Sequence, residues 1–193
     1  HDYYKQKYNL IRDHGIVAKM NIVHSGVDTL TYCPLSNFLT RNHTIENRKI
    51  RVVTHHWSNN YLKGFEVYRY LDKYISEHPD CGIEFIYIGN YNYDTYKPIA
   101  TTIYPPLSPS EIAKLLKNAD IYLTATQYEP GAMHYLEAMA CGLPVVYREN
   151  GGGADEICNK CGIQFIDKTD YISAILKAYD NRDKLVNNIE DFH

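Results

Sequence analysis

IYLTATQYEPGAMHYLEAMACGLPVVY, residues 121–147, joins two short apolar runs through a longer segment with helical spacing. The runs at 121–125 and 145–147 have the length of strands, and residues 131–141 between them are expected to form a helix. Gly142 and Pro144 are residues that end a helix. The stretch therefore predicts a strand–helix–strand unit, the building block of a parallel sheet.

The same alternation extends in both directions from this unit. Upstream, strands are predicted at 50–54, 83–88 and 99–103, and helices at 61–78 and 108–118. The second of these helices opens with Ser108, Pro109 and Glu111, which are typical of a capped N-terminus. Downstream, a short helix is predicted at 154–158, a strand at 163–166 and a closing helix at 171–186. This pattern predicts an α/β fold, a Rossmann-like parallel sheet with helices on both faces.

Composition and charge limit the class of protein. The chain has 193 residues, of which 45% are hydrophobic, so one domain with its own core is expected. The net charge of −3 argues against general binding to nucleic acid. No apolar run approaches the roughly 18 residues of a membrane span, and no leader is evident. Five cysteines without framework spacing favour a reducing compartment, and a cytoplasmic location is expected.

Two glutamates flank the start of the predicted central helix. Glu129 lies in the loop before it, and Glu137 lies almost two turns beyond Gly131. The first N–H groups of a helix have no internal partner and can bind phosphate, and a glycine allows close approach. The pattern is compatible with a phosphate site between two carboxylates that hold sugar hydroxyls. Solvent-exposed glutamates, one on a loop and one on a helix surface, are the alternative.

A second polar segment, THHWSNNYLKG at 54–64, follows the first predicted strand. Lys63 beside Gly64 near a helix start suits a diphosphate, because the lysine supplies a point charge and the glycine permits close backbone approach. The sequence contains no phosphate loop of the Walker type. A solvated lysine is the alternative.

Together these segments resemble the donor-binding, C-terminal half of retaining GT-B glycosyltransferases, the group 1 or family-four class. Residues 22–28 resemble the interdomain segment viPNGVD, and Lys63-Gly64 resembles the phosphate-binding lysine element. Glu129 and Glu137 match the family's pair of glutamates with seven residues between them. The runs EAMACGLPV at 137–145 and GGADE at 152–156 resemble the family's EAMACGxPV and GGxxE.

The resemblance implies roles for the matching positions. Glu129 and Lys63 would be the catalytic residues, with Glu129 at the transferred sugar and Lys63 at the diphosphate leaving group. Glu137 would hold the ribose hydroxyls. Further donor contacts are expected from the backbone N–H groups of Gly131, Ala132 and Met133. The other expected contacts come from Ser58 and from the loops near Gly89 and Tyr104. Neither a metal nor a cofactor is expected, and the donor is expected to be UDP- or GDP-linked.

The sequence departs from the family pattern at two places. The family usually has an arginine a few residues before the lysine, where this chain has residues 55–58, so Ser58 or a histidine is expected to hold the diphosphate instead. Pro130-Gly131-Ala132 replaces the usual Phe-Gly.

A GT-B enzyme needs a second half of similar size, which this chain lacks. We interpret residues 1–45 as an interdomain or tail segment from the acceptor-side half and residues 46–193 as the nucleotide-sugar donor-binding domain, excised or naturally separate. The missing half would act in cis or in trans on a glycan, lipid or protein acceptor. The alternatives are a non-catalytic nucleotide-sugar-binding subunit that needs a partner chain, a GT-B-like nucleotide-sugar epimerase, or a phosphorylase.

Several other residues admit two readings. The pair Cys158 and Cys161 suits a redox or metal site or a plain turn, and His55 with His56 suits a metal site or part of the loop. His134 is expected to pack on the helix face or contact substrate rather than act as a base. The tyrosines near residue 93 are expected to pack within their loop or to stack on sugars: Tyr91, Tyr93 and Tyr96.

Overall fold

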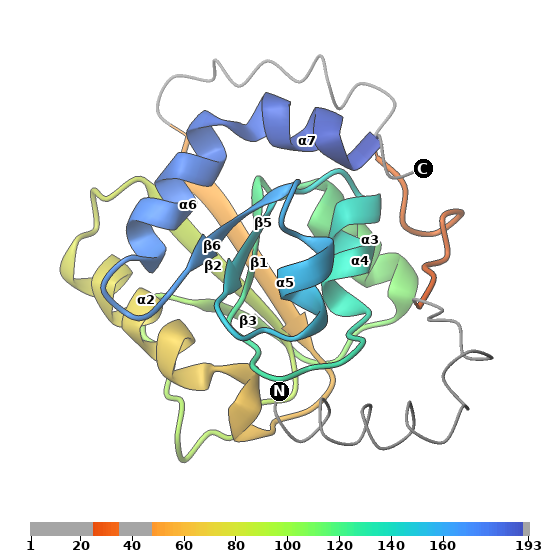
Figure 1. The fold of residues 1–193 in the computed structure, drawn as a ribbon. Helices are drawn as coiled ribbons and strands as arrows, with labels where there is room; N and C mark the ends of the chain where they lie inside the picture. The colour runs from red at the N-terminus through yellow and green to blue at the C-terminus, as the bar shows by residue number, and fades with distance from the viewer. Residues whose placement is uncertain (1–24, 35–47, 191–193) are drawn as a thin grey trace, which may run out of the picture.

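Six parallel strands form one sheet in the order β3-β2-β1-β4-β5-β6. The computed structural model describes residues 25–34 and 48–190, so the expected domain boundary at 45/46 and the start of the 22–28 segment lie outside the described residues (Figure 1). The strands are β1 Ile50–His56, β2 Ile83–Gly89, β3 Thr102–Tyr104, β4 Ile121–Thr124, β5 Val145–Arg148 and β6 Gly162–Phe165. The predicted Rossmann-like sheet is confirmed. Its strand order reverses between β1 and β4, the point at which such sheets bind ligands.

Helices cover both faces of the sheet (Figure 1). They are η2 Tyr61–Lys63, α2 Phe65–Glu77, α3 Pro109–Lys117, α4 His134–Ala140, α5 Gly153–Ile157, α6 Tyr171–Asp180 and α7 Arg182–Glu190. Side chains of α2 and α6 share one apolar cluster with strand residues such as Val52. Side chains of α3, α4 and α5 share the other, with strand residues such as Val53. Neighbouring strand residues therefore face opposite layers, as expected for a sheet buried on both sides.

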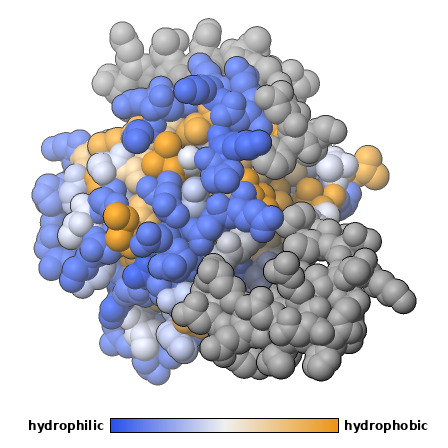
Figure 2. Space-filling model, in the orientation of Figure 1, coloured by the Kyte–Doolittle hydropathy of each residue, from blue (hydrophilic) through white to orange (hydrophobic). Residues whose placement is uncertain are grey.

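Tyrosine is a major component of both apolar layers. Five tyrosines have almost no exposed surface: Tyr68, Tyr87, Tyr96, Tyr122 and Tyr135. Tyr96 therefore packs in the core, whereas Tyr93 is 63% exposed. On the face shown in Figure 2, hydrophilic residues cover most of the described surface and hydrophobic residues show between them. Within residues 25–34 and 48–190, no helix has the length and apolarity to cross a membrane.

Several predicted elements have different bounds in the structure. The predicted helix at 61–78 divides at Gly64, which has a φ of 77° and ends the short helix η2 before α2 begins. The predicted strand at 99–103 shortens to β3 because the Asp72 carboxylate accepts the backbone N–H groups of Ile99, Ala100 and Thr101. The predicted closing helix divides at Asn181, whose side chain donates to the Lys177 carbonyl.

The helix expected at 131–141 begins only at His134. The segment 131–133 is therefore a loop that leads into α4, and this corrects the expectation that Gly131 opens the helix. In contrast, α3 begins where the sequence predicts, after Ser108, and the Glu111 carboxylate accepts the Ser108 backbone N–H at 3.0 Å.

Candidate functional site

A cavity of about 520 Å³ lies at the carboxyl ends of β1, β2 and β4. Its lining contains the predicted catalytic residues Lys63 and Glu129 and the predicted donor-binding residues Glu137 and Ser58, together with the predicted loop Gly131, Ala132 and Met133. Tyr104 does not line this cavity and packs against the core. The structure thus brings together residues that are up to 79 positions apart in the sequence, between Ser58 and Glu137.

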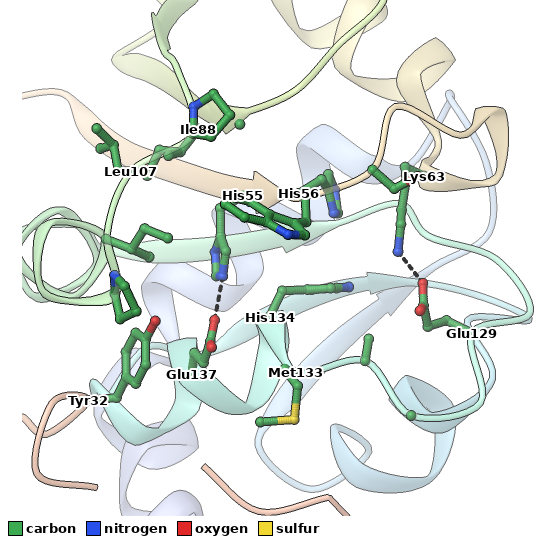
Figure 3. Close-up of a pocket in the computed structure, with 18 residues that line it drawn as sticks. Tyr32, His55, His56, Lys63, Ile88, Leu107, Glu129, Met133, His134 and Glu137 are labelled. Carbon is green, nitrogen blue, oxygen red and sulfur yellow. Dashed lines mark hydrogen bonds and ion pairs between the residues drawn. The ribbon is translucent and has the colours of Figure 1, made fainter. Parts of the chain in front are cut away.

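Lys63 and Glu129 form an ion pair on one side of the cavity (Figure 3). Two backbone features hold them together. The Gln127 N–H donates to the Leu62 carbonyl at 2.9 Å, which ties the loop after β4 to η2. A Cβ atom at Gly64 would lie 2.3 Å from the Ala125 carbonyl oxygen, so only glycine allows the Lys63 turn to approach β4 this closely. Gly64 therefore positions the charge of Lys63 at the cavity, in addition to leaving space for a ligand to approach the backbone.

The backbone of Glu129 is held by the glycine turn at 151–153. The Glu129 N–H donates to the Gly151 carbonyl at 3.2 Å, and the Glu129 carbonyl accepts the Gly153 N–H at 2.8 Å. Gly152 has a φ of 80°, and a Cβ there would lie 2.4 Å from the Glu129 carbonyl oxygen. The glycines expected to form a simple turn thus fix the loop that carries one of the two site carboxylates.

Glu137 lies on α4, and its carboxylate lies within hydrogen-bond distance of His55 Nε2 on β1, at 2.7 Å (Figure 3). Tyr32, from the segment 25–34, lies beside Glu137. Burial and the Glu137 carboxylate raise the pKa of the Tyr32 hydroxyl, so it remains a protonated donor at neutral pH. The side chain of Glu137 is only 18% exposed, and a ligand hydroxyl must approach it from within the cavity.

Two further histidines line the cavity between these pairs. His56 is 3% exposed and His134 is 8% exposed. Each has one ring nitrogen beside a buried tyrosine hydroxyl: His56 Nε2 lies 2.6 Å from Tyr68, and His134 Nδ1 lies 3.2 Å from Tyr122. Burial lowers the pKa of both rings well below the usual value, and the charge of Lys63 lowers it further. Both imidazoles are therefore neutral at physiological pH.

We expect the stability of the chain to fall as the pH drops below about 6.5, the ordinary pKa of histidine. His56 and His134 stay neutral in the folded chain, whereas the unfolded chain binds their protons, so stability present above that pH is lost as the pH falls. Each histidine contributes about 1 kcal/mol between pH 6.5 and 5.5. Urea unfolding of wild type and His134→Gln at both pH values measures the effect. The variant should lose less stability than wild type, and equal losses would contradict the prediction.

Sequence reasoning missed Tyr32, and it named His55, His56 and His134 only as alternatives. β1 continues to His56, so His55 and His56 belong to a strand, although they were expected in a loop. The signal in the sequence was the position of these two polar residues directly after an apolar strand. Tyr32 reaches the cavity from a segment without regular periodicity, and no sequence signal indicated it. Within residues 25–34 and 48–190, no group of three or more His, Cys, Asp or Glu side chains is placed to hold a metal ion.

The cysteine pair lies away from this cavity. Cys158 and Cys161 are both buried and unbonded to each other, and they pack in the apolar cluster of α4 and α5. Burial raises the pKa of Cys161 to about 11 and also raises that of Cys158. A thiol with a raised pKa is a poor nucleophile at neutral pH, which favours the reading of the pair as a structural turn.

Part of the chain matches a known protein family, and two curated proteins have similar sequences. Residues 96–191 match the family described as "Glycosyl transferases group 1". A probable sucrose-phosphate synthase from Thermosipho melanesiensis is 37% identical over 83 residues, which cover 40% of this chain and 20% of that protein. Spore coat protein SA from Bacillus subtilis is 28% identical over 163 residues, which cover 72% of this chain and 43% of that protein. The chain spans less than half the length of these two relatives.

Solved structures share the fold. The glycosyltransferase WaaG, involved in lipopolysaccharide biosynthesis, matches with a TM-score of 0.69 at 16% identity, over 89% of this chain and 51% of that one. Anabaena Alr3699/HepE in complex with UDP and glucose matches with a TM-score of 0.66 at 17% identity, over 89% of this chain and 51% of that one. The C-terminal domain of a glycosyl transferase group 1 family protein from Francisella tularensis matches with a TM-score of 0.62 at 18% identity. The match covers 86% of this chain and 95% of that one. The fold is thus that of one half of larger glycosyltransferases.

Proposed function

Because the chain belongs to the group 1 glycosyltransferases, we propose that it forms the half of a retaining GT-B enzyme that binds the nucleotide-sugar donor. The proposal rests on the order of chemical groups along the cavity. Apolar side chains including Ile88 and Leu107 lie at one end, Glu137 follows, and Lys63 and Glu129 lie at the other end (Figure 3). A nucleotide sugar has the same order of parts: base, ribose, diphosphate and sugar.

Each part of the donor meets a matching group in this arrangement. The apolar wall suits the flat face of a base, and the Glu137 carboxylate accepts hydrogen bonds from ribose hydroxyls. Lys63 is the one Lys or Arg among the described residues that line the cavity. Its charge would stabilise the diphosphate as negative charge develops on the leaving group. The N–H groups of the 131–133 loop would add further donors at the same place.

In the unliganded site, the charge of Lys63 is paired with the Glu129 carboxylate. A bound diphosphate competes with Glu129 for Lys63, and it releases the Glu129 carboxylate to face the transferred sugar. Lys63 has 13% and Glu129 has 29% of the side chain exposed, so exchange of partners is less costly than leaving either charge alone. Donor binding would therefore prepare both groups for the reaction.

Transfer of the sugar needs an acceptor-side domain. We propose that this domain is supplied in the same protein or by a partner chain, and that the sugar is transferred with retention of configuration and without a metal. A UDP-linked donor is the first candidate, because HepE, which shares this fold, was solved with UDP and glucose. The acceptor is a glycan, lipid or protein.

Calorimetric titration with UDP, GDP, ADP and CMP, in the presence of EDTA, tests the proposal. We expect one nucleoside diphosphate to bind with a stoichiometry of one and no detectable transfer by this chain alone. Binding of none of them, with the chain folded by circular dichroism, would overturn the proposal. Transfer by this chain alone would overturn the need for a second half.

Glu129→Ala should not weaken nucleoside diphosphate binding, because the substitution frees Lys63 from its partner. The same substitution should reduce transfer in a complete enzyme, since the carboxylate at the sugar is lost. Diphosphate affinity by calorimetry and turnover with the acceptor-side half measure the two effects. Loss of diphosphate binding in Glu129→Ala would show that this residue holds the nucleotide rather than the sugar.

A further inference from the structure

The buried histidine pair has two ring nitrogens that the fold does not use. His56 Nδ1 and His134 Nε2 are both buried, and both are without a hydrogen-bond partner among the described residues. The two ring centroids lie 4.9 Å apart, and both rings line the cavity. Figure 3 shows the two rings between the His55–Glu137 pair and the Lys63–Glu129 pair. Buried polar atoms are usually paired, so two such atoms in one cavity indicate a ligand that pairs them.

The proton positions of His56 follow from its neighbours. The Tyr68 oxygen accepts the Ala125 N–H at 3.2 Å and the Thr54 hydroxyl at 3.5 Å, so both of its lone pairs are used. This leaves the Tyr68 hydroxyl proton for His56 Nε2 at 2.6 Å. Since the ring is neutral, its single proton then lies on Nδ1, the nitrogen without a partner. His56 therefore carries an uncharged N–H donor, without a partner among the described residues, in the wall of the cavity.

His134 can present a second donor in the same way. The Tyr122 oxygen accepts the His55 backbone N–H at 3.2 Å. Its hydroxyl lies 3.2 Å from His134 Nδ1, 3.2 Å from His55 Nδ1 and 3.3 Å from the His55 carbonyl oxygen. When Tyr122 donates to His134 Nδ1, the proton of the neutral His134 ring lies on its Nε2. An anionic ligand oxygen in the cavity favours this arrangement. In the other tautomer of His134 the unprotonated Nε2 would face the negative charge.

We propose that His56 and His134 bind the donor diphosphate through their uncharged ring N–H groups, beside Lys63. The inference rests on the proposed function and names two side chains that would share the diphosphate with Lys63. Ser58 is less suited to this task, because it is exposed and its hydroxyl accepts the Asn60 N–H at 3.2 Å. One lysine and two neutral donors would then share the diphosphate.

Paired substitutions separate a donated hydrogen bond from a structural role. Gln places an amide N–H near the position of His Nε2, and Asn places one near His Nδ1, so His134→Gln and His56→Asn retain a donor. His134→Leu and His56→Leu remove it. We expect each Leu variant to bind UDP at least about 10-fold more weakly than wild type, as for one lost hydrogen bond to a charged group. The amide variants should stay within about 3-fold, and uridine affinity should change less than 2-fold in all four.

Nitrogen-15 NMR of the histidine rings gives a second measurement that does not require a variant to fold. We expect the Nδ1–H form of His56 in the free chain and the Nε2–H form of His134 in the UDP complex, with both signals shifting on addition of UDP. The exposed His78 serves as the control that should not shift. If UDP binds but neither ring signal moves, or if the Leu variants bind UDP as wild type does, the inference is wrong and the proposed function survives. If wild type binds no nucleoside diphosphate, the proposed function itself fails.

Discussion

Lys63→Ala should weaken binding of the donor's nucleoside diphosphate by about 10- to 150-fold and leave binding of the parent nucleoside nearly unchanged. The loss corresponds to about 1.5–3 kcal/mol for one hydrogen bond to a charged group. Two effects act in the same direction: the cation at the diphosphate is removed, and Glu129 loses its partner and repels the phosphates.

Calorimetry of the diphosphate and the nucleoside, for wild type and Lys63→Ala, measures this difference. Lys73→Ala is the matched control, because Lys73 is exposed on α2 and pairs with Glu77 away from the cavity. An equal loss for nucleoside and diphosphate in Lys63→Ala would place the lysine outside the phosphate site.

Glu137→Ala should weaken nucleoside and nucleoside diphosphate alike, by about 1–3 kcal/mol or roughly 5- to 150-fold. The carboxylate accepts charge-assisted hydrogen bonds from ribose, and both ligands contain the ribose. The substitution also leaves His55 without its partner at 2.7 Å, so His55→Gln is needed as a control for that loss. The deoxyribose analogues should show a smaller effect of Glu137→Ala than the ribose ligands. Unchanged nucleoside binding in Glu137→Ala would contradict the ribose assignment.

The sequence predicted the parts of the fold that depend on local pattern. The apolar strands and the capped helix α3 could be predicted because periodicity and capping residues act within a few positions. The bounds of β3 could not, since Asp72 binds residues 99–101 from a distant helix. The break at Gly64 has a similar origin, because the approach of Ala125 is a contact between separate segments.

The motifs predicted the charged residues of the candidate site. They did not predict that three histidines would come together between those residues. Lys63, Glu129 and Glu137 lie in segments whose spacing resembles a family, and the structure places all three at one cavity. His55, His56 and His134 come together only when β1 and α4 pack, and His134 was expected either to pack on the helix face or to contact substrate. Their roles, like those of the three motif residues, stay predictions.

A crystal structure of the chain with UDP, or with whichever diphosphate binds best, tests the central claim most directly. We predict that the diphosphate lies within hydrogen-bond distance of Lys63 Nζ, that the ribose hydroxyls donate to Glu137, and that the base lies against Leu107. A nucleotide bound outside this cavity, or bound with its ribose at Lys63 and its diphosphate at Leu107, would contradict the claim.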